Sequence, residues 1–358
     1  MLYLKEMERI TTPKIEYICF TSHTGYAFAA RNYILALSPK YDVRVAPLDR
    51  GISPAITQKY LSTLLDLEKK PEEANALQIL HCIPNMFRRI KTRKKRLAFA
   101  TIEASKAPED WIKKLNDCDG IIVPSQFCKE VFSILEKPIY YIPHCLDYSQ
   151  YNLNVEKKHT YDKFTFLFFG TWKERKGWKT LIQAWKEVFA SDPNVQLVIK
   201  THDEALAKSG IRHIIKSIPP NILFDNGLLK DEELPSFFKS FNCLVAPTMG
   251  EGFGLPGLQS LSVGVPIITT AYSGVLEYAN ENNALLLVPE GTRRMSNPLD
   301  GYMQFANQEW PFISVSQLAK QMLKAYNKSM VIESDAWGLL ARRFGYESTR
   351  EKFERIKL

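Results

Sequence analysis

The chain has 358 residues, of which 45% are apolar, so it can bury two cores, and its length alone predicts about two domains. No apolar run approaches the roughly 20 residues of a membrane span, and the first residues, MLYLKEMERITT, lack a signal-peptide profile. These features argue against a membrane-spanning protein, and we expect a soluble, cytoplasmic one whose net charge of +8 permits peripheral contact with an anionic surface.

The first predicted strand is KIEYICF, Lys14 to Phe20. The next segment, TSHTGYAFAARNYILALS, predicts a loop at Gly25 that leads into a helix. His23 lies in this loop and could serve a ligand there. A lone loop histidine is more often a surface or packing residue, so both interpretations stay open.

Positive charge concentrates in RRIKTRKKR, Arg88 to Arg96, where seven of nine residues are cations. Such a run could bind an anionic membrane surface, DNA phosphate or a charged polysaccharide. The alternative is a solvated loop between two strands. The sequence does not separate these possibilities.

The strand RLAFATIE ends at Glu103, a carboxylate that could orient a substrate hydroxyl or take its proton. The alternative is a strand-end acid paired with a nearby lysine. Further on, Asp117 and Asp119 imitate a metal-binding acid pair, but they precede the strand GIIVPS, away from the expected phosphate site, and we expect no metal there.

The second half opens with a buried strand, FTFLFFG, Phe164 to Gly170, followed by a charged loop and an amphipathic helix. Lys173, Arg175 and Lys176 lie in that loop. Cations just outside the carboxyl end of a strand would neutralise a diphosphate. The alternative is a solvated helix start, although cations are electrostatically unfavourable there unless an anion joins them.

The most informative segment is GEGFGLPGLQS, which follows the predicted strand FNCLVAP and begins a helix. Gly252 and Gly254 allow a ligand to approach the backbone, and Pro256 suits the first turn of a helix. The helix start offers unpaired N–H groups to an anion, while the Glu251 carboxylate could accept hydrogen bonds from sugar hydroxyls. Glycine turns also occur in α/β units that bind nothing, so the neighbouring motifs must decide whether this turn binds a ligand.

From Phe164 to Pro289 the chain alternates strand and helix, with turns at Gly227 and at Ser273 and Gly274. This order predicts a parallel sheet with crossover helices, whose turns open on one edge. The tail from Pro311 to Leu358 is predicted to be helical. The six cysteines have neither zinc nor redox spacing, and we expect reduced core residues.

Several of these segments resemble the retaining, sugar-nucleotide-dependent glycosyltransferases of family four: FFGTWKERKGWKTLIQAW, GEGFGLPGLQS, VPSQF and IPHCLD. This family has the α/β GT-B fold of two facing Rossmann-like domains, with a C-terminal helix that crosses back to the first. The resemblance spans most of the chain and is most specific at EGFGLP. It implies an acceptor-side domain over residues 1–155, completed by helix 336–358, and a donor-binding domain over residues 156–335.

The resemblance also assigns roles to residues. Lys176, with Arg175 beside it, matches the family lysine that binds the donor diphosphate. Glu251 matches the acid that contacts the transferred sugar. Glu103 lies where relatives place a histidine or acid near the acceptor hydroxyl, which completes the expected catalytic set. The residues expected to bind the donor are Gly25, Gly170, Lys173, Leu228, Gly252, Phe253, Gly254, Leu255, Gln259 and Glu277.

Two positions depart from the family pattern. The second acid of the family, which binds the ribose, is replaced by Gln259, whose amide oxygen still accepts a hydrogen bond but more weakly than a carboxylate. Thr171 stands where many relatives have an arginine, and we expect Arg175 to supply that charge. His144 lies where relatives have asparagine or histidine, and we interpret it as part of the hinge between the domains.

The resemblance implies transfer of a sugar from a UDP- or GDP-sugar to a hydroxyl of a glycan, lipid-linked glycan or polysaccharide, with retention of configuration. No bound cofactor or metal is expected. An acceptor base in DNA, a catalytically silent protein that binds sugar nucleotides or nucleic acid, and an epimerase or phosphorylase on the same fold remain alternatives.

Overall fold

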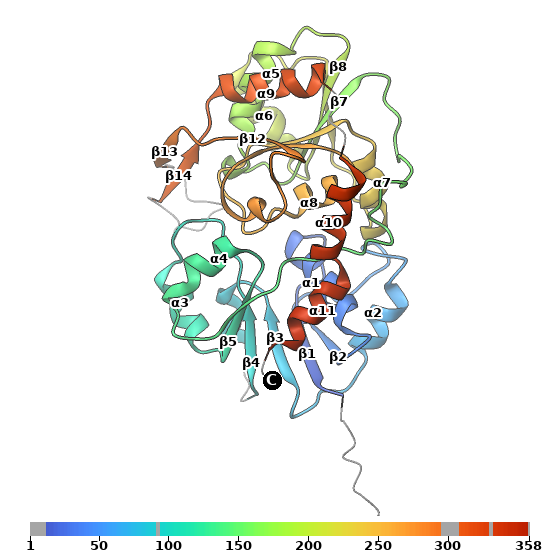
Figure 1. Cartoon of the computed structure of the whole chain (residues 1–358), viewed down its shortest axis with the longest axis vertical. Coiled ribbons are helices and arrows are strands. Elements are labelled where there is room, and N and C mark those ends of the chain that lie inside the picture. The colour runs from blue at the N-terminus through green and yellow to red at the C-terminus, as the bar shows by residue number, and fades with distance from the viewer. Residues whose placement is uncertain (1–11, 91–93, 295–307, 329–331, 357–358) are drawn as a thin grey trace, which may run out of the picture.

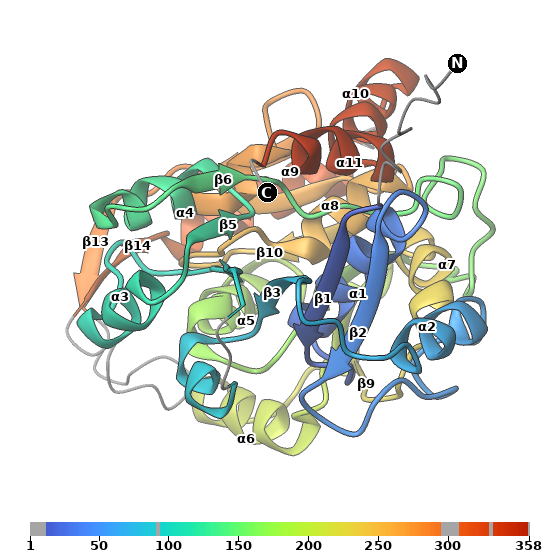
Figure 2. The same ribbon diagram turned by 90° about the horizontal axis from the view of Figure 1, so that it is seen from below.

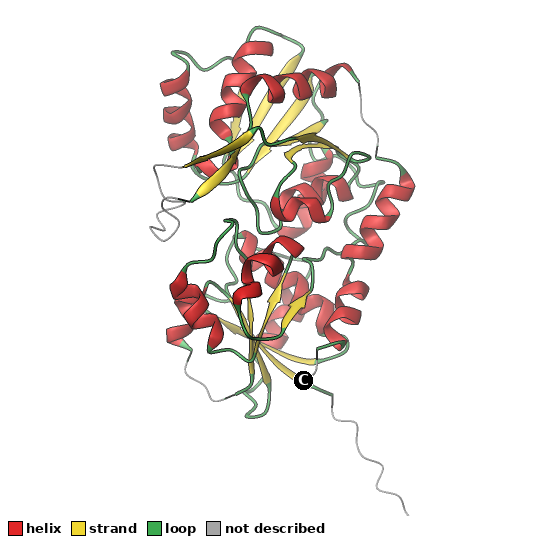
Figure 3. Cartoon of the chain, turned by 60° about the vertical axis from the view of Figure 1, so that its left-hand side comes forward, coloured by secondary structure: helices red, strands yellow, loops and turns green. Residues whose placement is uncertain are grey.

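The computed structural model describes residues 12–90, 94–294, 308–328 and 332–356. The chain forms two lobes, each built around a six-stranded parallel sheet (Figures 1 and 3). Helices cover the faces of both sheets, as the alternation of apolar strands and amphipathic helices predicts.

The first lobe contains the sheet ordered β2-β1-β3-β4-β5-β6. Its strands are β1 (Lys14–Cys19), β2 (Asp42–Pro47), β3 (Leu77–His81), β4 (Arg96–Phe99), β5 (Gly120–Val123) and β6 (Ile139–Tyr141). Its helical segments are α1 (Gly25–Leu37), α2 (Leu61–Glu68), η1 (Pro84–Arg89), α3 (Glu109–Asn116), α4 (Gln126–Val131) and η2 (Phe132–Ile134).

The second lobe contains the sheet ordered β12-β11-β10-β7-β8-β9. Its strands are β7 (Phe164–Phe169), β8 (Val195–Lys200), β9 (Ile222–Asp225), β10 (Cys243–Ala246), β11 (Ile267–Thr270) and β12 (Ala284–Leu287). Its helical segments are η3 (Glu174–Lys176), α5 (Trp178–Val188), α6 (Glu204–Ile214), η4 (Asp231–Glu233), α7 (Leu234–Lys239), α8 (Leu255–Ser262), η5 (Ser273–Glu277) and α9 (Val315–Asn327). In both sheets the carboxyl ends of the strands carry the loops expected to form the site.

Two helices return the chain to the first lobe, α10 (Ser334–Phe344) and α11 (Tyr346–Glu354), where the sequence predicts one (Figures 1 and 2). The break falls at Gly345, whose backbone is extended and pairs with Leu146. A Cβ atom at Gly345 would lie 2.6 Å from the carbonyl oxygen of Ala341, so a larger residue would crowd this corner. The predicted return is confirmed, with a corner at Gly345 that divides the expected single helix in two.

The predicted helical tail also begins differently. Pro311 lies in β14 (Glu309–Phe312), which pairs antiparallel with β13 (Gly291–Arg294) to form a small hairpin. Proline is tolerated in such a two-stranded ribbon because one side of each strand needs no partner. The amphipathic helix predicted after it is present as α9.

Apolar residues form four clusters, one on each face of the two sheets. One of them crosses the boundary between the lobes: Phe28 and Ala29 of α1 pack with Leu255 and Leu258 of α8 and with Phe344 of α10. All six cysteines are buried and free, as expected for core residues. No helix in the described part of the chain is long and apolar enough to cross a membrane.

Candidate functional site

The site forms where the loops after β7 and β10 meet. Gly177 has a φ of +73°, and a Cβ atom there would lie only 1.8 Å from the carbonyl oxygen of Pro247, so only glycine allows this approach. The Met249 N–H donates to the carbonyl of Arg175 at 2.7 Å. These contacts bring the cationic loop beside the turn that carries Glu251.

A network of charges results. Lys176 Nζ lies 2.7 Å and Arg175 Nη1 lies 3.1 Å from the same oxygen, Oε1 of Glu251. Thr248 donates its hydroxyl to that oxygen at 3.1 Å, and Arg175 Nη1 also donates to the Gly250 carbonyl at 2.6 Å. The side chains of Arg175 and Glu251 are 7% and 12% exposed, so water screens them little.

This environment fixes the charge of Glu251. Burial alone would raise its pKa, but the cations Arg175 and Lys176 outweigh burial and lower the pKa to about 2. Glu251 is therefore a carboxylate at neutral pH and can only accept hydrogen bonds.

Glu103 joins the network from the first lobe, with Oε1 at 3.4 Å from Arg175 Nη2. The carbonyl of Glu103 also packs against Gly250, where a Cβ atom would approach it to 2.3 Å. The sequence leaves open a pairing with a nearby lysine; the structure shows that an arginine of the other lobe is one partner of this carboxylate. Arg175 thus lies between two carboxylates from facing lobes.

The glycine turn itself packs on the first lobe. A Cβ atom at Gly252 would lie 2.1 Å from Thr101 Cγ2, and Ser125 Oγ donates to the Gly252 carbonyl at 2.6 Å. Phe253 is 2% exposed and meets His144 edge to face, with ring centroids 4.9 Å apart. Burial lowers the pKa of His144 to about 3, so its imidazole is neutral. The turn is thereby enclosed between the lobes.

The helix start lies beside this network. Gly254 has a φ of +83° and precedes Leu255, the first residue of α8, with Pro256 next. Below the turn is a cavity of about 30 Å³, lined by Glu251, Lys176 and residues of β7, β10, β11 and α8. That volume suits roughly one water molecule.

The other predicted donor-binding residues of the second lobe lie in varied surroundings. Gly170 has a φ of +149° and lies against the Lys176 side chain, which is 3.7 Å from its built Cβ position. Lys173 is half-buried, and its N–H donates to the carbonyl of Thr171 at 2.9 Å. Leu228, just after β9, is 61% exposed.

Two predicted residues are engaged elsewhere in this structure. The Gln259 side chain is buried and donates to the hydroxyl of Tyr151 at 2.7 Å, a partner that the sequence gives no means of finding. Glu277 accepts from the Gln126 N–H at 2.6 Å and from Arg343 at 2.5 Å, so it joins the second lobe to the first and to α10.

In the first lobe, Gly25 begins α1 after the N-cap Thr24, and no atom lies within 4 Å of its built Cβ position. His23 Nε2 is buried without a hydrogen-bond partner among the described residues. The basic run lies partly outside the described residues. Within it, Lys94 pairs with Glu16 and Glu72, which favours a structural role for that lysine.

Asp117 and Asp119 take part in backbone contacts. Arg96 donates its side chain to the Asp117 carbonyl, and the Arg96 N–H donates to Asp119 at 2.8 Å. Across the described ranges, no group of three or more His, Cys, Asp and Glu residues could hold a metal ion.

The sequence predicts a turn at Ser273 and Gly274, but not that this turn supports Glu251. Ser273 has a φ of +66°, in the left-handed region that disfavours serine, and its Oγ accepts from the Glu251 N–H at 2.9 Å. Gly274, next to it, lies so close to Gly252 that a Cβ atom would approach the Gly252 carbonyl to 2.2 Å. The sequence signal for this support is a serine beside a glycine in the loop after a strand.

Comparison with known structures defines the class. A crystal structure of HepE from Anabaena in complex with UDP-glucose aligns with a TM-score of 0.68 over 95% of this chain and 98% of that one, at 14% identity. With two facing parallel α/β sheets and returning helices, the chain has the GT-B fold, as predicted. At this identity the likeness shows the fold alone.

Sequence comparison also relates part of the chain to glycosyltransferases. Residues 163–297 match the family model of glycosyl transferases group 1, so the recognised kinship with glycosyltransferases is confirmed. The uncharacterized glycosyltransferase MJ1607 of Methanocaldococcus jannaschii is 21% identical over 65% of this chain and 60% of its own length. The capsular polysaccharide biosynthesis glycosyltransferase CapM of Staphylococcus aureus is 29% identical over 36% and 34%. The chain thus spans less than two thirds of these relatives.

Proposed function

We propose that this protein transfers a sugar from a nucleoside diphosphate to an acceptor hydroxyl, with retention of anomeric configuration. The observation that carries the proposal is the enclosed network in which Lys176 and Arg175 share one oxygen of Glu251. Two cations at the carboxyl end of β7 can stabilise a leaving diphosphate, and a fixed carboxylate can accept hydrogen bonds from sugar hydroxyls.

The proposed mechanism needs no nucleophilic side chain. The diphosphate leaves with electrostatic help from Lys176 and Arg175, and one of its oxygens assists deprotonation of the incoming hydroxyl on the same face of the sugar. Glu103, held near Arg175, would orient the acceptor or take its proton. Such stabilisation of a developing anion contributes several kcal/mol, roughly 10²–10³ in rate for one donor.

We assign donor binding to residues 156–335 and acceptor binding to residues 1–155 with 336–358. The loop at Gly25 would face the diphosphate, because it opens into free space at the start of α1. The turn from Gly252 to Leu255 would contact sugar and phosphates through its backbone, and Leu228 would meet the base. Because Gln259 is bound to Tyr151, ribose contact there requires a rearrangement. Glu277 serves the contact between lobes in this arrangement.

The enclosed geometry has a consequence for the donor. The cavity beside Glu251 measures about 30 Å³, far below the roughly 300–1,000 Å³ of pockets for small ligands. The residues that line this cavity all belong to the second lobe, whereas the turn beside it packs on the first lobe through Gly250 and Gly252, so sugar hydroxyls would reach Glu251 once that contact between the lobes opens. We propose that this is the closed arrangement and that the donor enters an open one.

A thermal-shift panel of nucleoside diphosphates and UDP- and GDP-sugars tests the proposal. UDP is the first probe because HepE was crystallised with UDP-glucose. A ligand at 100 times its dissociation constant should stabilise by about 2.7 kcal/mol, and Lys176→Ala should abolish the shift. Lys179→Ala is the matched control, because Lys179 lies in the same segment, is 47% exposed and contacts only Glu174 among the ion pairs of the described residues.

Turnover is measured as release of nucleoside diphosphate with and without an acceptor glycan, and the anomeric configuration of the product by NMR. Release with a retained configuration supports the whole proposal; an inverted product would overturn retention. A nucleotide shift without release under any condition would favour a silent binding protein. No shift with any nucleotide would overturn the donor site.

A further inference from the structure

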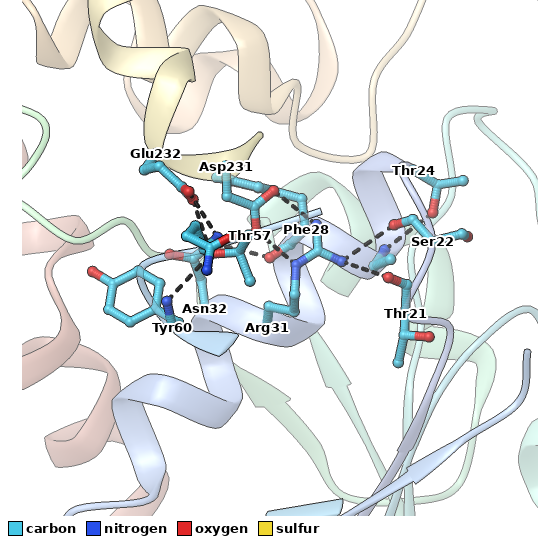
Figure 4. Close-up of polar contacts among 12 residues, drawn as sticks. Thr21, Ser22, Thr24, Phe28, Arg31, Asn32, Thr57, Tyr60, Asp231 and Glu232 are labelled. Carbon is cyan, nitrogen blue, oxygen red and sulfur yellow. Dashed lines mark hydrogen bonds and ion pairs between the residues drawn. The ribbon is translucent and has the colours of Figure 1, made fainter. Parts of the chain in front are cut away.

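Arg31, on α1 of the first lobe, contacts the second lobe through a buried ion pair (Figure 4). Its Nε and Nη2 donate to the two oxygens of Asp231 at 2.6 and 2.9 Å, a bidentate arrangement. The Arg31 side chain is 2% exposed and that of Asp231 14% exposed. Such planar pairing fixes direction as well as distance, so it sets the relative position of the groups that it joins.

The same guanidinium holds a loop of its own lobe. Nη1 of Arg31 donates to the carbonyls of Thr21 and Ser22 at 3.1 and 3.2 Å (Figure 4). From the other side, Asp49 accepts the N–H groups of Thr21 and Ser22 at 2.9 and 3.0 Å. The loop ends at the N-cap of α1 and Gly25, the position proposed to face the diphosphate.

A second contact lies beside the ion pair. Glu232 accepts from Thr57 Oγ1 at 2.9 Å and from the Gln58 N–H at 2.7 Å, and the Asp231 N–H donates to the Ile56 carbonyl at 2.9 Å. The start of η4 is thus bound to the loop before α2 by side-chain and backbone hydrogen bonds. Together these contacts join the lobes through η4, which begins three residues after Leu228.

The buried pair favours two discrete states. Arginine remains charged, so Arg31 buried without Asp231 would be strongly unfavourable. Separation of the lobes must therefore expose both groups to water together. An element of this kind is either formed or fully broken, which is the property that a switch between closed and open lobes requires.

We propose that Arg31 is a positioning residue that clamps the closed lobes through Asp231 and, with the same side chain, fixes the Thr21–Thr24 loop for the donor diphosphate. This inference rests on the proposed function for its link to the donor. Its structural half, the clamp, stands on the contacts alone. The two roles can be tested separately, because Asp231 takes part in the clamp but does not contact the loop carbonyls that Arg31 binds.

Two conservative variants separate the roles. Asp231→Asn removes the charge pair but leaves the bonds from Arg31 to the loop carbonyls, whereas Arg31→Lys loses the fork geometry needed for both. We expect both variants to lower kcat by about tenfold or more, the size of a lost charge-assisted hydrogen bond. Only Arg31→Lys should also raise the donor KM, because only that change releases the loop.

Two readouts do not need activity. Small-angle X-ray scattering should show a larger radius of gyration for both variants, and hydrogen exchange at residues 21–24 should accelerate about tenfold only in Arg31→Lys. Glu232→Gln, which leaves the ion pair intact, should give a smaller increase in radius. Lys40→Gln is the control, since it breaks an exposed ion pair with Glu354 inside the first lobe.

The outcomes are distinct. An unchanged radius of gyration and unchanged kcat in Asp231→Asn would overturn the clamp, even with glycosyl transfer established. An equal acceleration of exchange in both variants would overturn the separate role of Arg31 in the loop. If the wild type shows no turnover, the proposed function fails, and scattering and exchange still decide whether the clamp exists.

Discussion

Replacing Glu251 with glutamine keeps the shape of the side chain and removes its charge. The difference between an ordinary glutamate pKa of 4.5 and a pKa of about 2 corresponds to roughly 3 kcal/mol of stabilisation by Arg175 and Lys176. For a domain the size of the second lobe, each kcal/mol shifts Tm by about 2–4 °C. We therefore expect Glu251→Gln to unfold about 6–12 °C below the wild type at pH 7.

The difference should depend on pH in one direction. A carboxyl with a depressed folded pKa stabilises the protein fully above its unfolded pKa, and this stabilisation is lost as the pH falls from about 4.5 toward 2. By pH 3.5 the wild type should have lost about 1 kcal/mol of it, so the gap in Tm narrows by about 2–4 °C.

The assay is thermal unfolding, followed by circular dichroism, at pH 7 and pH 3.5. The control is Glu174→Gln, an acid of the same segment whose ion pair with Lys179 is partly exposed and contributes about 1 kcal/mol or less. A gap of equal size at both pH values would refute the reasoning, because the charge of Glu251 would then not be the source of the stability. Absence of a gap at pH 7 would refute it as well.

Three further predictions concern the surroundings of the site. His144→Asn should reduce the fall in Tm between pH 6.5 and pH 4. Burial lowers the His144 pKa to about 3, so in the wild type acid protonates this imidazole in the unfolded chain but not in the folded protein, which destabilises the fold. Gly252→Ala should lower Tm and nucleotide turnover, and adding Thr101→Ser, which removes the methyl 2.1 Å from the new Cβ, should restore part of both. Tyr151→Phe should cost about 1–3 kcal/mol in urea unfolding, because it leaves the Gln259 amide buried without its partner.

Much of the fold was accessible from the sequence because its strands are continuous apolar runs. The run FTFLFFG is typical of a strand buried on both faces, and it forms β7 in the interior of the second sheet. The corner at Gly345 was not predicted, although a signal for it exists: Phe353 lies nine positions after Phe344, about half a turn out of phase with Leu340 and Phe344 on a continuous helix. The hairpin β13–β14 was missed because its residues, such as GTRR, carry no alternation of apolar and polar side chains.

The candidate site was predicted in part. Glycines around Glu251 and cations after β7 are local signals, and the structure brings Lys176, Arg175 and Glu251 together. Contacts between lobes are different, because nothing in the sequence of α1 indicates that Arg31 meets Asp231, 200 positions away. The partner of Gln259 was hidden for the same reason. Roles of individual residues in catalysis remain predictions for the experiments above.

The first lobe can complete its folding only after the C-terminal helices have been synthesised. Phe353 and Ile356 are 1% and 5% exposed and pack among residues of β1, β2 and α1. A nascent chain therefore finishes the whole second lobe before it can close the apolar face of the first one. Until then that face stays open to other proteins, and the first lobe gains its full cooperativity only with contacts more than 300 positions apart in sequence, such as Tyr41 with Phe353. Although the strands of the first sheet are synthesised early, we expect the nascent first lobe to need chaperones until the C-terminal helices cover its apolar face.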